Sequence, residues 1–338
     1  MLRFSDAKIV GPVQNDIADT NAKSSHVGDK PIFCEASGNQ RASELYHATT
    51  EYLAESFEGV KEGQSFDIER GFGIVSDIVD STVTRDEWYE AINQISYPIQ
   101  PDAFLVLHHA NVAIYSICLS ITLRFTRDEQ RAVGLAALLH DIGKVCLSGD
   151  ILCKEGQLTN VEREELRQYP YKSFEILSTF GKKIDVQAQC ALMVNERIDG
   201  SGFPRGLAGD LIHCYAQMIG LVDVYEAMTS SRPYRQKWLH YDAIREILRK
   251  RKRAFHQSYI RALLKTFSVF RLNTYVRLNS GVIGKIIEVR EELPLRPKIQ
   301  VMYDSESLKL AVPYVVDLST QPVLHIAAPV AESDLNSI

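Results

Sequence analysis

The sequence predicts a mainly α protein, in which a helical bundle is preceded by a short N-terminal unit and followed by a small C-terminal β-meander. Before residue 270, apolar residues recur at spacings of three and four over long stretches, as in helices with a buried face. After residue 270, β-branched and turn residues replace that pattern. The chain has 338 residues, 45% hydrophobic and 24% charged, which is typical of a globular protein of two or three structural units.

The N-terminal hundred residues predict two different segments. Residues 1–40 are rich in Asp, Asn, Ser, Lys and Gly with little periodicity, so we expect a flexible polar arm. Residues 41–99 are expected to form a helical or mixed unit of unknown role, with helices around 45–57 and 67–81.

Residues 100–270 predict the helical bundle itself. Thr159 followed three residues later by Glu162 matches a capping box, which marks the start of one helix. Three glycines and Pro204 within residues 200–207 predict a tight loop between two helices. The helices are expected at residues 105–125, 128–147, 160–179, 184–197, 211–230 and 240–266.

Residues 271–330 predict a small β-rich extension. Residues 275–284 show the pattern of a strand, a turn and a second strand, and strands are also expected at 285–289 and 298–303. This part of the chain is expected to form a β-meander appended to the helical domain.

Charge and cysteine content exclude several classes of protein. The 38 Lys+Arg and 43 Asp+Glu give a formal charge of −5, which argues against general nucleic-acid binding. No run of 18 residues is entirely apolar, and charges interrupt the first ten residues, so we expect neither a membrane span nor a signal peptide. The six cysteines are too sparse for a disulfide scaffold. We therefore expect a cytoplasmic protein.

Two histidines and two aspartates could together hold a divalent metal ion. His140 and Asp141 are adjacent and follow an apolar helix, where a buried carboxylate is costly unless it is paired or binds a metal. His108 and Asp223 are polar residues on otherwise apolar stretches. Taken singly, each is more simply explained as a hydrogen-bonded core residue. As a set, two imidazoles and two carboxylates can hold a metal and leave positions open for water and a phosphate oxygen.

Three motifs resemble the HD-GYP domain, a subfamily of the HD phosphohydrolases. The first motif covers residues 140–144 (HDIGK), the second 196–207 (ERIDGSGFPRGL), and the third runs from Asp223 to Arg235. The resemblance extends over residues 100–270 and implies an HD-type helical bundle with a buried metal centre. It favours iron or manganese over magnesium, and it implies hydrolysis of a cyclic dinucleotide, mostly cyclic di-GMP and sometimes cyclic GMP-AMP, in bacterial signalling.

The resemblance also assigns roles to individual residues. It implies that the metal ligands are His108, His140, Asp141 and Asp223, with Asp141 also a catalytic residue. Lys144 matches a catalytic lysine that faces a substrate phosphate. Arg232 and Arg235 match residues that bind the phosphates of the cyclic dinucleotide, for which the forked guanidinium is chemically suited.

Several family positions are altered in this chain. Tyr169 stands where the family has a histidine, and Val194 and Asn195 stand where it has a pair of histidines. Phe104 occupies the position where some members add a glutamate ligand. In the loop that gives the family its name, Gly202 and Pro204 remain, but Phe203 replaces the tyrosine. The lost residues are those that hold further metals, so we expect one metal per chain.

Three functions remain open from the sequence. The first is a cyclic di-GMP phosphodiesterase with a reduced metal centre and weak activity. The second is a non-catalytic descendant that binds a cyclic dinucleotide, or a diguanylate cyclase-type signalling protein through the loop from Gly200 to Leu207. The third is a one-metal HD phosphohydrolase that acts on a nucleotide monophosphate. A homodimer is compatible with each of the three.

Overall fold

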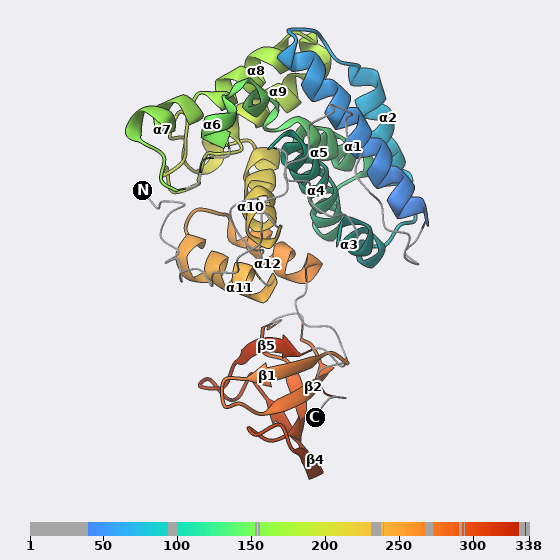
Figure 1. Ribbon diagram of the computed structural model, residues 1–338, viewed down its shortest axis with the longest axis vertical. Coiled ribbons are helices and arrows are strands. Elements are labelled where there is room, and N and C mark those ends of the chain that lie inside the picture. The colour runs from blue at the N-terminus through green and yellow to red at the C-terminus, as the bar shows by residue number, and fades with distance from the viewer. Residues whose placement is uncertain are drawn as a thin grey trace, which may run out of the picture. The chain divides into compact units, whose positions relative to one another are not determined.

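The computed structural model describes residues 40–93, 101–152, 154, 156–230, 238, 240–267, 273–290, 293, 295–330 and 335. The described residues divide into two compact units (Figure 1). The first lies within Met1–Leu239 and Glu246–His256, and the second within His240–Arg245 and Gln257–Ile338. The expected polar arm of residues 1–40 lies almost wholly outside the described part.

Three helices open the first unit: α1 (Gln40–Lys61), α2 (Ile68–Asp80) and α3 (Arg85–Asn93). Asp67 caps α2 by accepting hydrogen bonds from the backbone N–H groups of Glu69 and Arg70. One face of α1 is buried and packs against α2, α3 and the long helix α4 (Pro101–Thr122). The N-terminal helices are therefore packed directly on the central helices of this unit.

Helix α4 and helix α5 (Arg127–Leu139) form the centre of the first unit and pack along each other (Figure 1). A capping box between Thr126 and Glu129 starts α5. The window Phe104–Thr122 is long and apolar enough to cross a membrane, with a mean hydropathy of 1.6, although the sequence led us to expect no such segment. Because 83% of this window is buried inside the unit, the hydropathy is that of a core helix.

The first unit also contains η1 (Ile142–Cys146), α6 (Gly149–Leu152), α7 (Asn160–Leu166), α8 (Tyr169–Ser178), η2 (Gly181–Ile184), α9 (Asp185–Met193), η3 (Gly209–Leu211), α10 (Cys214–Thr229) and the π-helix η4 (Ile247–Arg251). Helix α9 packs against α5, and α10 packs against α4. Helix α8 packs against α9 and the 3₁₀ helix η1.

The expected helix boundaries differ from the observed ones where the chain turns at functional residues. The helix expected over 128–147 ends at Leu139, and η1 continues the chain in a tighter 3₁₀ conformation. The helix expected over 184–197 ends at Met193. The helix expected over 240–266 is divided into α11 (His240–Glu246), η4 and α12 (Gln257–Thr266).

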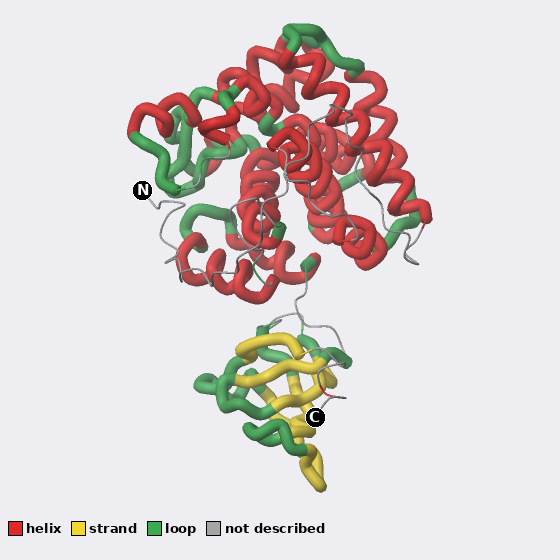
Figure 2. Tube along the Cα trace, viewed as in Figure 1, coloured by secondary structure: helices red, strands yellow, loops and turns green. Residues whose placement is uncertain are grey.

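The second unit contains a five-stranded antiparallel sheet of order β4-β3-β2-β1-β5. In Figure 2 the strands are yellow. The sheet has its own core, which includes Val276, Ile286, Ile299 and Val301, each at most 1% exposed. The strands are β1 (Tyr275–Leu278), β2 (Ile283–Glu288), β3 (Lys298–Tyr303), β4 (Lys309–Asp317) and β5 (Ile326–Val330).

Candidate metal site

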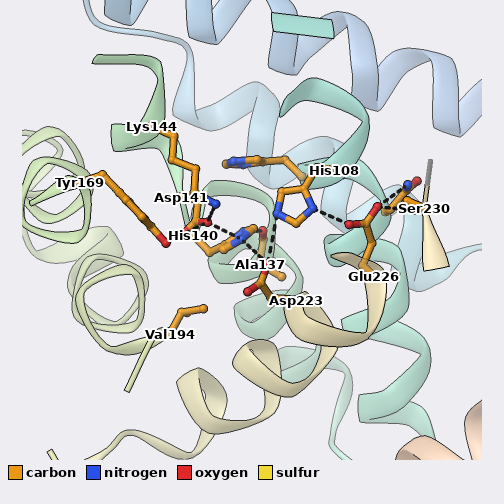
Figure 3. A network of polar contacts seen from close by, with 12 residues as sticks. His108, Ala137, His140, Asp141, Lys144, Tyr169, Val194, Asp223, Glu226 and Ser230 are labelled. Atoms are coloured by element: carbon orange, nitrogen blue, oxygen red, sulfur yellow. Dashed lines mark hydrogen bonds and ion pairs between the residues drawn. The ribbon is translucent and has the colours of Figure 1, made fainter. Parts of the chain in front are cut away.

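Four side chains from three parts of the first unit converge on one point. His108 lies on α4, His140 and Asp141 lie where α5 ends, and Asp223 lies on α10 (Figure 3). Each residue offers one ligand atom, and these atoms all lie within 4.8 Å of one another. This is the set expected from the sequence, and it is the group of metal-binding type found among the described residues.

The turn after α5 places His140 and Asp141 because it packs closely on α8. Gly143 donates its backbone N–H to Ser173 Oγ at 2.9 Å. A Cβ atom at position 143 would lie 2.4 Å from the carbonyl oxygen of Tyr169 and 2.5 Å from the backbone nitrogen of Ser173. The glycine of the HDIGK motif is therefore required by this close approach between two segments of backbone.

Hydrogen bonds fix both imidazole rings with the same nitrogen facing the centre of the cluster. The Nδ1 atom of His140 lies 2.7 Å from the carbonyl oxygen of Ala137, which can only accept, so Nδ1 carries the proton. The Nδ1 atom of His108 lies 2.6 Å from Glu226 Oε2. The Nε2 atom of each ring is thereby left to face the cluster (Figure 3), as in histidines that bind metals.

Three buried atoms at the cluster lack a hydrogen-bond partner among the described residues: His108 Nε2, His140 Nε2 and Asp141 Oδ1. Their nearest charged neighbours are carboxylate oxygens, since His108 Nε2 lies 3.2 Å from Asp223 Oδ1 and His140 Nε2 lies 3.3 Å from Asp141 Oδ2. Such groups are costly to bury unless something satisfies them. The side chain of Asp223 is 15% exposed, whereas the other three residues are 0–1% exposed. These residues fit a divalent cation that is held on one side by the protein and reached from the side of Asp223.

The electrostatics of the cluster favour negatively charged carboxylates. Burial raises the pKa of Asp141, but His140 and Lys144 outweigh it and lower the pKa below its usual range. Burial likewise raises the pKa of Asp223, but His108 and His140 hold it well below the usual value. Burial lowers the pKa of His140, and the two aspartates overcome this and raise it to about 9. The two carboxylates are therefore ionised, and a cation bound between them would replace the proton that they stabilise on His140.

The second oxygen of Asp141, Oδ2, lies 3.3 Å from His140 Nε2 and also contacts Lys144 and Tyr169. The Lys144 ammonium forms an ion pair with Asp141 Oδ2, and the Tyr169 hydroxyl donates to the same oxygen at 3.3 Å. Lys144 Nζ also lies 4.9 Å from the centre of the Tyr169 ring. Burial, followed by the charges of Asp141 and Asp223, raises the pKa of Tyr169 well above its usual value. Tyr169 is therefore a neutral phenol that donates a hydrogen bond, and a phenolate ligand is disfavoured.

The other altered positions line the same region without adding a ligand. Val194 is fully buried and carries no donor atom, and Asn195 is 7% exposed with an unpaired amide Nδ2. The ring of Phe104 stacks on His108, with 5.9 Å between ring centroids. An apolar or neutral side chain thus stands at each of these positions.

The loop of residues 200–207 is held by one buried carboxylate and lies beside Tyr169. Glu196 accepts hydrogen bonds from the backbone N–H groups of Arg205 at 2.7 Å and Leu207 at 2.9 Å. At Gly202 a Cβ atom would lie 2.4 Å from the Cα atom of Glu196, so the glycine is needed for close packing. The Phe203–Pro204 peptide bond is cis, and the Phe203 ring meets the Tyr169 ring edge to face with 6.3 Å between centroids.

Two expected phosphate-binding residues, Arg232 and Arg235, lie outside the described residues.

Two residues that the sequence analysis missed take part in the site: Glu226 binds His108, and Asn111 donates to Glu226 at 3.0 Å. The sequence feature that could have indicated Glu226 is its position on an apolar helix, three residues after Asp223. His109 directs Nδ1 to the carbonyl oxygen of Leu138 at 2.9 Å and is not one of the four clustered residues.

A helical unit that brings two histidines and two aspartates together at the end of a central helix is the architecture of an HD domain. Comparison with known families supports this class: residues 99–258 match the HD domain, and residues 275–338 match the KOW domain associated with HD domains. Residues 99–258 thus form an HD domain, and the motifs at residues 140–144 and 196–207 are those that resemble the HD-GYP subfamily.

Several curated proteins are similar to this chain. The cyclic di-GMP phosphodiesterase PA4108 of Pseudomonas aeruginosa is 31% identical over 263 residues, which cover 78% of this chain and 62% of that protein. The cyclic di-GMP phosphodiesterase response regulator RpfG of Xanthomonas campestris pv. campestris is 36% identical over 42% of this chain and 38% of its own length. The 3′3′-cGAMP-specific phosphodiesterase 2 of Vibrio cholerae is 26% identical over 72% of this chain and 46% of its own length. The chain thus spans less than two thirds of each of these relatives.

A solved structure shares the fold. Bd1817, an HDG"Y"P protein from Bdellovibrio bacteriovorus, superposes with a TM-score of 0.53 at 14% identity and covers 69% of this chain and 74% of its own. At this identity the likeness concerns the fold alone.

Proposed function

We propose that this protein is a metal-dependent phosphodiesterase for a cyclic dinucleotide, with cyclic di-GMP as the first candidate substrate, that works slowly with one metal ion per chain. The observation that carries the proposal is the group of three buried, unpaired atoms on His108, His140 and Asp141 that converge with Asp223. The names of the relatives support the choice of substrate. Iron or manganese suits a mixed imidazole and carboxylate site.

The residues around Asp141 favour a single metal. Its Oδ1 atom is buried and unpaired, whereas Oδ2 contacts His140 Nε2, Lys144 and Tyr169. A second metal would need ligands beyond Asp141, and the positions available for them hold the neutral Tyr169, the buried Val194 and Phe104. These residues therefore favour one cation per chain, with the Lys144 ammonium beside Asp141.

In this mechanism the chain supplies ligands on one side and a fixed positive charge on the other. When bound, a divalent metal lowers the pKa of a water molecule and polarises a phosphate oxygen. His108, His140, Asp141 and Asp223 would hold it. Lys144 would contact a phosphate oxygen and stabilise the leaving oxygen as its negative charge develops.

Other parts of the chain would bind the substrate or a partner. Arg232 and Arg235 would bind the substrate phosphates. The assignment of the protein to the cytoplasm and to bacterial signalling, and the expected homodimer, are parts of this proposal.

A second candidate is a non-catalytic binding protein, which is favoured by the buried, ligand-free side chain of Val194. It would bind a cyclic dinucleotide, or a diguanylate cyclase-type protein through residues 200–207. The third candidate, a phosphohydrolase for a nucleotide monophosphate, needs the same metal ligands but no second phosphate-binding group.

Metal analysis combined with an activity assay separates these functions. Protein prepared under reducing conditions with Mn²⁺ or Fe²⁺ should contain at most one tightly bound metal per chain and hydrolyse cyclic di-GMP well below 1 s⁻¹, which is at the low end of ordinary turnover numbers. His140→Ala should lose both the metal and the activity, while His47→Ala, on the exposed side of α1, should retain both. Two metals per chain, or turnover of 1 s⁻¹ or more, would contradict the one-metal mechanism.

The choice of substrate is tested by binding. Metal-loaded protein should bind cyclic di-GMP or cyclic GMP-AMP more tightly than GMP, and Arg232→Ala/Arg235→Ala should abolish that binding, since a charge-assisted contact contributes about 1.5–3 kcal/mol. Full binding without any hydrolysis would instead support the non-catalytic protein. Preferred hydrolysis of a nucleotide monophosphate would support the third candidate.

A further inference from the structure

A chain of buried hydrogen bonds connects helix α1 to the candidate metal ligand His108. The Tyr46 hydroxyl on α1 donates to Asn111 Oδ1 at 2.7 Å, and Asn111 Nδ2 on α4 donates to Glu226 Oε1 at 3.0 Å. Glu226 Oε2 on α10 lies 2.6 Å from His108 Nδ1. All four residues are 0–1% exposed, so solvent does not compete for these bonds.

Glu226 is suited to its position because donors surround it. Besides His108 and Asn111, Ser230 donates its hydroxyl to Oε1 at 2.6 Å (Figure 3). An ionised carboxylate is purely an acceptor, so it can take all three bonds, whereas an amide would turn one donor group towards another donor. The contact with His108 keeps the proton on Nδ1 and leaves Nε2 directed at the cluster.

The direction of the bonds is fixed along the chain from α1. Because Glu226 only accepts, Asn111 must present Nδ2 to it, and the Oδ1 atom of Asn111 must then face Tyr46. Tyr46 is therefore the donor that fixes the orientation of the Asn111 amide. A side chain on α1, a helix for which the sequence indicated no role, is thus bonded to the support of His108.

We propose that Glu226 is a positioning residue for the metal site and that helix α1, through Tyr46 and Asn111, holds Glu226 in place, so that the N-terminal helix sets the metal affinity of the domain. The proposal rests on the proposed function in one respect, namely that His108 binds a metal. It adds a second group of residues that acts on the metal through His108 and touches neither the metal nor the substrate.

The test measures binding of Co²⁺ alone, by its visible absorption spectrum and by competition with a chelator. Glu226→Gln should weaken Co²⁺ binding about 10–100-fold and change the absorption band, as expected when the partner of a ligating histidine is altered. Tyr46→Phe removes one hydroxyl and keeps the ring, so it should weaken binding about 2–10-fold, the equivalent of one hydrogen bond.

Tyr52→Phe is the matched control. Tyr52 is a buried tyrosine on the same helix, and its hydroxyl lies outside the hydrogen-bond chain and lacks a hydrogen-bond partner in the described structure. This variant should bind Co²⁺ like the unaltered protein, with the same spectrum.

The outcomes separate the inference from the proposed function. Failure of the unaltered protein to bind Co²⁺ would reject the metal site and the inference with it. Normal binding by both Glu226→Gln and Tyr46→Phe would overturn the inference and leave the metal site standing. If Glu226→Gln does not fold, Tyr46→Phe decides the matter alone. A defect in Glu226→Gln but not in Tyr46→Phe would overturn the role of α1 and support the positioning role of Glu226.

Discussion

At the scale of single residues, Asp141 connects the ligand cluster to Lys144 and Tyr169. Its Oδ1 atom is buried and unpaired, while Oδ2 lies 3.3 Å from His140 Nε2 and also contacts Lys144 and Tyr169. A carboxylate that bridged two metals would need both oxygens for metals. In this chain an ammonium and a phenol contact the second oxygen, so a second metal at that oxygen would have to displace them.

Lys144 should be needed for hydrolysis but not for metal binding. We expect Lys144→Met to reduce hydrolysis of cyclic di-GMP about 10²–10³-fold, the usual effect of removing a preorganised electrostatic donor, with the metal content unchanged. Lys172→Met is the control, because Lys172 pairs with Glu175 on the exposed face of α8. Equal rates for Lys144→Met and the unaltered protein would show that Lys144 has no part in the reaction.

Histidines at the three altered family positions should create a second metal position. In the triple variant Tyr169→His/Val194→His/Asn195→His, we expect the metal content to rise from one to two per chain and hydrolysis to become faster, since a second cation can stabilise the leaving oxygen. Elemental analysis and the same assay measure both. If the metal content rises and the rate does not, the loss of activity extends beyond the metal ligands, and the binding-protein function becomes the better one.

The sequence indicated the four candidate ligand residues because they are polar residues of the right types on or beside apolar helices and match the motifs of the resemblance. It could not predict that Glu226 supports His108, because the two lie 118 positions apart in the chain. A glutamate on an apolar helix has the same appearance in sequence whether it faces solvent, a ligand or a histidine. Only the packing of α10 against α4 selects among these.

At the scale of elements, the turn from α5 into η1 should tolerate no side chain at Gly143. Gly143→Ala places a Cβ against two backbone atoms that cannot move independently, and we expect it to destabilise the protein by about 1–3 kcal/mol and to weaken metal binding. Gly149→Ala is the matched control, since no atom lies within 4 Å of its added Cβ. Thermal unfolding with and without Co²⁺ measures both effects, and equal melting temperatures for the two variants would contradict the packing argument.

The errors in predicted helix boundaries have a common physical cause. Hydrophobic periodicity continues past Leu139 and Met193, yet the chain leaves the α-helix at both places. After Leu139 the chain turns so that His140 and Asp141 both reach the cluster, and after Met193 it turns towards the loop held by Glu196. Tertiary contacts that form the site override the local pattern, and a local pattern carries no information about them.

At the scale of the whole molecule, the change near residue 270 from helical periodicity to β-branched and turn residues is followed by the first strand at Tyr275. The strands expected at the start of residues 275–284 and at 298–303 are confirmed, whereas the strand expected to end at 284 and the one expected at 285–289 form the single strand β2, and β4 and β5 were not individually predicted. Strand β4 is an edge strand with a largely exposed surface, so it lacks the alternation of buried and exposed residues that identifies a strand from sequence.

Because each unit has its own core, damage to one core should leave the function of the other intact. Ile299 is fully buried in the core of the sheet, and Ile299→Ala should cost about 2–5 kcal/mol in the unfolding of that unit. The four candidate metal ligands all belong to the first unit, so Co²⁺ affinity should be unchanged.

The corresponding change in the first unit should have the opposite result. Leu135 is fully buried on α5, one turn before the His140–Asp141 pair, and Leu135→Ala should weaken Co²⁺ binding, since the cavity it leaves loosens the helix that carries two ligands. Unfolding followed by circular dichroism and by Co²⁺ absorbance separates the two units. Loss of Co²⁺ binding in Ile299→Ala would mean that the sheet supports the metal site, and the division into two independent units would then be wrong.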